Sequence, residues 1–181
     1  MEEFRGESVR PRCAPPAVTT DSLDALDAFA RALEWADRFE WRKAADLLKA
    51  AVRLDSRFAM AWAWLASAQL WLEEPRAAER AAARAAALAE EVSENERHFV
   101  LAVRASFEGR LAEAIDHLEL LLALDPCDFW AAYRLAHLYL AAGRTEDSLS
   151  MRERCAALRP EHVFNFSEAG FIANREFNVE L

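Results

Sequence analysis

The sequence has little glycine and little cysteine. Four glycines and six prolines in 181 residues leave few positions for tight turns, which argues against a β-sandwich or β-barrel and favours long helices. The three cysteines are an odd number without close spacing, so they give neither a disulfide framework nor a zinc site. The composition therefore predicts an all-α fold without a metal site.

Basic residues and long apolar runs are also scarce. The chain has 22 Lys and Arg against 31 Asp and Glu, a formal charge of −9, whereas duplex nucleic acid requires clustered positive charge. The most apolar run, residues 58–72, contains Ser67 and Gln69 and is shorter than the roughly 20 residues of a membrane helix. Residues 1–20 lack the apolar core of a signal peptide. We therefore expect neither a nucleic acid nor a membrane as a partner, and a cytoplasmic location.

Catalytic and cofactor signatures are missing as well. The histidines have no His, Glu or Cys partner at the sequence spacing of metal ligands. The sequence contains neither a glycine-rich phosphate loop nor a Gly-x-Ser-x-Gly nucleophile elbow. These observations predict that the chain is not an enzyme and binds no cofactor.

What the sequence does contain is a repeat. The segment that begins at Gly109-Arg110 and runs to Pro126 recurs as the segment from Gly143-Arg144 to Pro160, an offset of 34 residues. A period of this length in an Ala- and Leu-rich sequence is typical of helix-turn-helix solenoids. In this register residues 1–20 form a flexible tail, and residues 21–181 form one repeat domain. Its expected units are 25–58, 59–94, 95–128, 129–162 and a partial unit 163–181.

The same kinds of residue recur at the same positions of each unit, numbered so that Gly109 and Gly143 stand at position fifteen. Small residues at positions eight and twenty are expected where two helices cross closely. Large apolar residues at positions seven and thirty are expected in the core. The small residues are Ala32, Ala66, Ala102, Ala136, Gly170, Ala44, Ala78, Ala114 and Ser148, and the large ones are Leu65, Leu101, Leu135, Leu54, Leu88, Leu124 and Leu158.

This pattern resembles the tetratricopeptide repeat (TPR) family, whose motif is Trp-x2-Leu-Gly-x2-Tyr, then Ala-x3-Phe, then Pro. The residues that carry the resemblance are Trp62, Leu65, Ala66, Ala114, Leu118, Pro126, Leu135, Ala136 and Tyr139. The resemblance implies a right-handed α-solenoid of about four units, with a C-terminal half-repeat or capping helix. It also implies a protein-interaction scaffold with a protein or peptide partner.

Two short stretches resemble a narrower group. Residues 19–26 and residues 92–97 are similar to parts of the TPR regions associated with bacterial serine/threonine kinases and transcriptional regulators. This resemblance implies an alternative role as the regulatory region of a larger bacterial signalling protein. No kinase signature lies within the 181 residues.

Helical periodicity predicts where a partner would bind. Positions two, five, six, nine, twelve and thirteen of each first helix share the face turned away from the second helix. This inner face is strongly aromatic, and burying a large apolar side chain is worth about 1.5 to 3 kcal/mol. We therefore expect an apolar or amphipathic peptide or helix as ligand. The candidate groove residues are Trp64, Ser67, Trp71, Phe99, Val103, Phe107, Trp130, Tyr133, Arg134 and His137.

Two alternatives remain open at this stage. Aromatic residues on an inner face also pack against neighbouring first helices, so Trp64 and Trp71 belong either to the core or to a ligand site. The partial unit 163–181 has three readings: it caps the stack, the chain is a fragment of a longer protein, or the unit pairs with a second copy to give a self-associating homodimer. Arg134 and His137 are placed to hold a single carboxylate. The carboxylate clamp of chaperone-binding TPR adaptors is absent, because Phe29, Leu33 and Trp64 stand where that clamp has Lys and Asn.

Overall fold

The structure is a computed structural model that describes residues 18–162, and these residues form α-helices without a strand. The predicted all-α helical repeat is confirmed. The rest of the predicted tail, the partial unit 163–181 and the homodimer contact assigned to that unit lie outside the described residues. The helices are α1 (Leu23–Ala36), α2 (Trp41–Leu54), α3 (Ala59–Trp71), α4 (Pro75–Ala86), α5 (Glu94–Phe107), α6 (Leu111–Leu124), α7 (Phe129–Ala141) and α8 (Thr145–Leu158), with a 3-10 turn, η1 (Ala89–Glu91), before α5.

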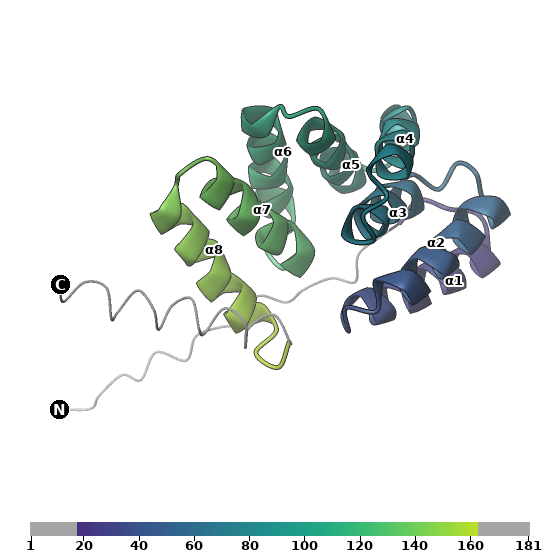
Figure 1. Cartoon of the computed structure of the whole chain (residues 1–181), viewed down its shortest axis with the longest axis horizontal. Helices are drawn as coiled ribbons and strands as arrows, with labels where there is room; N and C mark the ends of the chain where they lie inside the picture. Colours follow the sequence, from purple (N-terminus) through teal and green to yellow (C-terminus); the bar gives the residue numbers. More distant parts are fainter. Residues whose placement is uncertain (1–17, 163–181) are drawn as a thin grey trace.

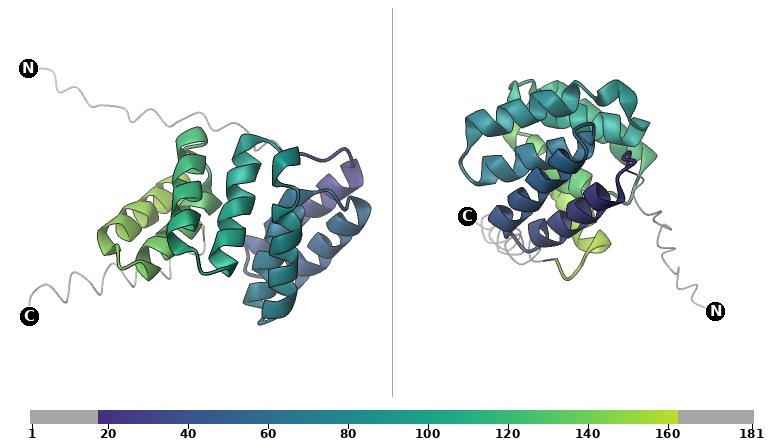
Figure 2. Two further views of the ribbon diagram at one scale, coloured as in Figure 1. Left: turned by 90° about the horizontal axis from the view of Figure 1, so that it is seen from above. Right: turned by 90° about the vertical axis from the view of Figure 1, so that its right-hand side faces the viewer.

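The helices pair as hairpins, and the hairpins stack in sequence order. Each odd-numbered helix packs most extensively against the even-numbered helix that follows it, and each hairpin then contacts the next. The result is an arc that runs from α1 and α2 to α7 and α8 (Figure 1). Figure 2 shows the same stack from above and from the end. The architecture is therefore a short helical solenoid.

The first helices begin where their sequences provide a cap. Ser22 accepts a hydrogen bond from the Ala25 amide at 3.2 Å, and Asp128 accepts one from the Ala131 amide at 2.9 Å. Ser93 and Glu96 form a reciprocal capping box at the start of α5. These helices begin within two residues of the unit boundaries that the repeat predicts.

The core follows the predicted small positions closely and the predicted large positions only in part. Within residues 18–162 every small residue at positions eight and twenty is buried, and Gly170 lies outside these residues. At position thirty, however, Leu54 and Leu124 are 52% and 46% exposed, so the prediction that they lie in the core is wrong. Each is the last residue of its helix, beyond the turn that packs against the following unit. Leu88 at the same position is buried.

Position fifteen has the same backbone conformation in all four units. Phe39, Glu73, Gly109 and Gly143 have positive φ angles of 61°, 59°, 71° and 75°. In each unit the next amide donates to a carbonyl five residues earlier, as the Glu74 amide does to Gln69 at 2.9 Å. This is the Schellman closure of a helix, which needs a left-handed residue at its turn. Only the last two units supply glycine there.

At position fifteen we expect a substitution to glycine to raise the free energy of unfolding and a substitution from glycine to lower it. Glu73→Gly should raise the free energy of unfolding by about 0.5 to 1 kcal/mol, because a left-handed conformation costs a non-glycine residue about 1 to 2 kcal/mol. Gly109→Ala should lower it by a similar amount, and its added Cβ would meet nothing within 4 Å. Urea denaturation of both variants tests this. Changes of the same sign in both would contradict it.

Candidate functional site

A cavity of about 370 Å³ lies on the inner side of the arc. We call it the central cavity. Side chains from the first helix of every unit line it, together with residues from the connecting segments. The lining residues are Val18, Phe29, Leu33, Asp37, Met60, Trp64, Phe99, Asp125, Cys127, Asp128, Phe129, Trp130, Leu158 and Arg159.

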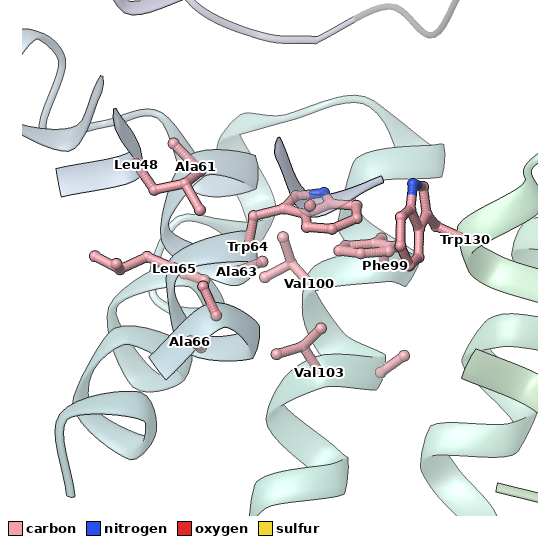
Figure 3. Close-up of a cluster of buried hydrophobic side chains, with 14 of the residues drawn as sticks. Leu48, Ala61, Ala63, Trp64, Leu65, Ala66, Phe99, Val100, Val103 and Trp130 are labelled. Carbon is pink, nitrogen blue, oxygen red and sulfur yellow. The ribbon is translucent and has the colours of Figure 1, made fainter. Parts of the chain in front are cut away.

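The aromatic wall of the cavity is also part of the protein core. Trp64 of α3 stacks on Phe99 of α5 with ring centroids 5.9 Å apart, and its ring meets the edge of Trp130 of α7 at 5.0 Å. All three side chains are buried, and Figure 3 shows them converging from three helices. These rings therefore hold units two, three and four together, and present only a small part of their surface to the cavity.

The other candidate groove residues divide into three groups. Val103, Ser67 and Tyr133 are buried beside the aromatic wall. His137 is exposed and packs its ring against Tyr133 at 4.5 Å. Phe107 is half-buried against the core, and Trp71 is 53% exposed and stacks on Trp41 at 5.5 Å with parallel rings. Of the ten candidate groove residues, only Trp64, Phe99 and Trp130 line the central cavity. The other seven, Arg134 among them, lie outside its lining.

Arg134 is a cation enclosed among these rings. Its guanidinium lies 5.6 Å from the Trp64 ring centroid and 5.0 Å from that of Phe99, and it donates a hydrogen bond to the Ser67 hydroxyl. Its Nε is shielded from solvent and has no hydrogen-bond partner. Burial lowers the pKa of Arg134 to about 10, although the charge of Asp128 opposes this shift. An enclosed cation without a bonded carboxylate favours an anion from outside the chain.

Burial also disfavours the charged form of two other titratable groups near the cavity. Partial desolvation against the neighbouring side chains lowers the pKa of His137, although the residue is exposed at its outer edge, and the nearby charges of Arg152 and Arg134 act in the same direction. Burial also raises the pKa of Asp128, while the hydrogen bond from the Ala131 amide opposes the shift. The inner face therefore combines a cation deep among the aromatic rings with carboxylates at its edge.

An ion pair joins the two ends of the arc next to the cavity. Asp37, which follows α1, lies 3.0 Å from the Arg159 guanidinium and 3.5 Å from Nε2 of His162. Burial lowers the pKa of His162, and the charge of Asp37 opposes this. The first unit and the end of the fourth unit are thus in direct contact.

The segment before α1 is bound to the repeats, which the repeat pattern does not indicate. The Thr19 amide and hydroxyl donate to the Glu96 carboxylate at 2.7 and 2.6 Å. The Thr20 hydroxyl donates to Asp55 at 2.6 Å. Residues 18–20, which the sequence places in a tail, therefore lie against units one and three. The only sequence signal is the run of hydroxyl residues before the first helix.

The sequence pattern also did not indicate a pair of histidines, because 19 residues separate the two side chains along the chain. His98 of α5 and His117 of α6 face each other with their Nδ1 atoms 3.1 Å apart. This spacing suits a hydrogen bond in which one ring carries the proton. Burial lowers the pKa of His117, and the charge of His98 adds to this. Within residues 18–162 no group of three or more His, Cys, Asp or Glu side chains is arranged to hold a metal ion.

Stacked helix hairpins with a lined inner face define the class of helical repeat solenoids. A family model for the tetratricopeptide repeat matches residues 108–160. These residues, which span α6 to α8, are therefore similar to the tetratricopeptide repeat. A search of curated proteins finds no match. In the part of the chain that the structure describes, no helix combines the length and apolar character needed to cross a membrane.

Several solved TPR structures are similar to this chain. The thermophilic TPR protein TTC0263 of Thermus thermophilus has 15% identity and a TM-score of 0.51, covering 75% of each chain. YrrB, a TPR protein with an unusual peptide-binding site, has 22% identity and a TM-score of 0.46, covering 83% of this chain and 76% of that one. The first TPR of Spaghetti (RPAP3), bound to an HSP90 peptide, has 22% identity and a TM-score of 0.47, covering 68% of this chain and 99% of that one. The likeness to TTC0263 supports the fold.

Proposed function

We propose that the chain is a protein-interaction scaffold without catalytic activity, which binds an apolar or amphipathic peptide or helix along its inner face. The observation that carries the proposal is the central cavity of about 370 Å³, to which the first helices of all four units contribute apolar side chains. Binding sites are typically concave and mostly apolar, with a few polar groups that fix orientation. Amphipathic helices and peptides recognise grooves of this kind through spaced apolar anchors.

Arg134 supplies the polar element of the proposed site. Arg134 is half-buried, and its guanidinium lies over two aromatic rings without a carboxylate partner among residues 18–162, which allows it to receive a carboxylate from a ligand. Hydrogen bonds between a guanidinium and a carboxylate are roughly twice as strong as neutral ones. The preferred ligand is therefore a peptide that combines apolar side chains with at least one carboxylate.

A random-peptide display selection on the full chain tests the proposal. We expect the selected peptides to be rich in apolar residues and to contain an acidic residue. Arg134→Gln should weaken their binding by about 10- to 100-fold, because a hydrogen bond to a charged group contributes about 1.5 to 3 kcal/mol. Fluorescence anisotropy with labelled peptides measures the affinity.

Arg104→Gln is the matched control. Arg104 lies on α5 and is already paired with Glu108, so its loss should leave peptide affinity nearly unchanged. Circular dichroism must show both variants folded. A selection that yields no binding peptide would contradict the scaffold proposal. Equal binding by wild type and Arg134→Gln would contradict the role of Arg134 only.

A further inference from the structure

Two histidines of the third hairpin form a contact that the proposed binding site does not use. His98 lies on α5 and His117 on α6, both residues are half-buried, and their Nδ1 atoms are 3.1 Å apart. The ring centroids are 5.3 Å apart, and the ring planes are tilted by 46°. The rings therefore meet through their nitrogen atoms rather than by parallel stacking, and they connect the two helices of the hairpin.

The distance between the two Nδ1 atoms allows only one of them to carry a proton. A ring nitrogen that bears hydrogen donates and a bare ring nitrogen accepts, so a hydrogen bond at 3.1 Å needs one of each. Nε2 of His117 lies 4.0 Å from the carboxylate of Glu113, which can only accept. This arrangement favours the Nε2–H form of His117, whose bare Nδ1 accepts a hydrogen bond from Nδ1–H of His98.

The first and the second proton that bind to this pair have opposite effects on it. A proton added at Nε2 of His98 leaves the Nδ1–H donor in place and makes the hydrogen bond charge-assisted, which strengthens it. A proton added at Nδ1 of His117 removes the acceptor, so that two N–H groups and two positive rings face each other. The pair therefore tolerates one positive charge and is broken by two.

Charged side chains from α5, α6 and η1 act on the pair. They are Glu113 and Asp116 of α6 and Arg97 of α5, which is itself paired with Glu90 of η1 at 2.9 Å. Burial and the charge of His98 lower the pKa of His117, and Arg97 acts in the same direction, whereas the two carboxylates of α6 oppose the shift. The unfolded chain therefore takes up this proton at a higher pH than the folded chain. The stability that the pair contributes is complete above the ordinary histidine pKa of about 6.5 and decreases as the pH falls below that value.

We propose that the His98–His117 pair is an acid-sensitive latch, which holds α5 against α6 while it carries at most one proton and releases α6 when the second proton binds. The latch acts next to the central cavity, because the residue after His98 is Phe99, which lines that cavity and stacks on Trp64. Release of the third hairpin would therefore loosen the aromatic wall. Only the effect on peptide binding rests on the proposed function.

NMR of the histidine side chains in the full chain, recorded from pH 8 to pH 4.5, tests the latch directly. We expect His98 and His117 to take up protons in two steps separated by at least about one pH unit, because strongly interacting sites titrate as a pair. The ring nitrogen shifts should show His117 in its Nε2–H form at pH 8. One independent step for each ring, at the same pH, would overturn the proposal.

Replacement of one ring tests the coupling between the two. In His98→Gln the protonation midpoint of His117 should rise by at least about half a pH unit, because the charge of His98 is gone and the glutamine amide can turn its oxygen toward a protonated ring. His137 of α7 lies outside the pair and is the internal control, whose midpoint should not change. A His117 midpoint that stays at its wild-type value contradicts the coupling.

Urea denaturation measures what the latch contributes to stability. Between pH 7.5 and pH 5.5 the unfolding equilibrium constant of the wild type should increase at least about threefold more than that of His98→Gln/His117→Gln, because half a pKa unit corresponds to about a threefold change. The other titratable groups are the same in both proteins. An equal pH dependence of the wild type and the double variant would overturn the latch.

Peptide binding at the two pH values separates the latch from the proposed function. We expect acidification from pH 7.5 to pH 5.5 to weaken the binding of display-selected peptides at least about twofold more in the wild type than in the double variant, because only the closed hairpin presents the complete wall. An equal change in both proteins overturns the link between the latch and the cavity. A selection that yields no binding peptide contradicts the scaffold, whereas the titration and the denaturation still decide the latch.

Discussion

Trp64→Ala is expected to lower the free energy of unfolding by about 3 to 5 kcal/mol, the usual cost of removing a large buried aromatic side chain. Trp64 is 3% exposed and contacts the rings of Phe99 and Trp130. The space it leaves lies between three helices that are also held by their own hairpin partners, so the site cannot collapse without separating a hairpin. Urea denaturation followed by circular dichroism gives the value.

Trp71→Ala is the matched control on the same helix. Trp71 is 53% exposed, and its main contact is the parallel stack on Trp41. Aromatic pairs add about 0.5 to 1.5 kcal/mol, so the loss should be about 1 kcal/mol. Equal losses in the two variants would show that Trp64 is not part of the core. The expected difference also makes Arg134, rather than Trp64, the residue of choice for testing ligand binding.

Glu96→Ala is expected to lower the free energy of unfolding by about 2 to 4 kcal/mol. Glu96 is 3% exposed, and its carboxylate accepts hydrogen bonds from Thr19 and Ser93, each through both an amide and a hydroxyl group. The substitution removes one half of the capping box and leaves these donors without their acceptor, and hydrogen bonds to a charged group are worth about 1.5 to 3 kcal/mol. Thermal denaturation measures the loss.

Glu94→Ala tests whether the effect of Glu96→Ala is local to its hydrogen bonds. Glu94 is exposed in the same first turn of α5, where a negative charge near the helix N-terminus contributes about 0.3 to 1 kcal/mol. Hydrogen exchange gives a second readout. The Thr19 amide should lose protection in Glu96→Ala and keep it in Glu94→Ala. Protection that survives in Glu96→Ala would contradict the role of this carboxylate.

The repeat pattern was sufficient to predict the helices and the close helix crossings. A 34-residue period with recurring small residues requires pairs of helices that approach closely, and residues such as Ala66 and Ala136 are fully buried where that argument places them. The capping residues Ser93 and Asp128 lie within one or two residues of the unit boundaries that the repeat predicts. These features depend on neighbours in sequence or on one hairpin.

Features that depend on how the hairpins stack could not be predicted. The contact of Trp64 with Trp130 is set by the curvature of the arc, which the pattern of apolar residues within one unit does not define. The left-handed backbone at Phe39 and Glu73 could not be predicted, because neither residue type favours a positive φ angle. His98 and His117 occupy different positions of their helices and meet only when the third hairpin folds.

The contact between Trp64 and Trp130 also affects how the array unfolds. In an open solenoid each repeat touches only its neighbours, so stability is approximately a sum of single-repeat and nearest-neighbour contributions. Here the second unit touches the fourth directly, with ring centroids 5.0 Å apart. Unfolding of the last hairpin would therefore expose part of Trp64 and weaken the second unit at the same time. This coupling favours a single cooperative transition over fraying from one end.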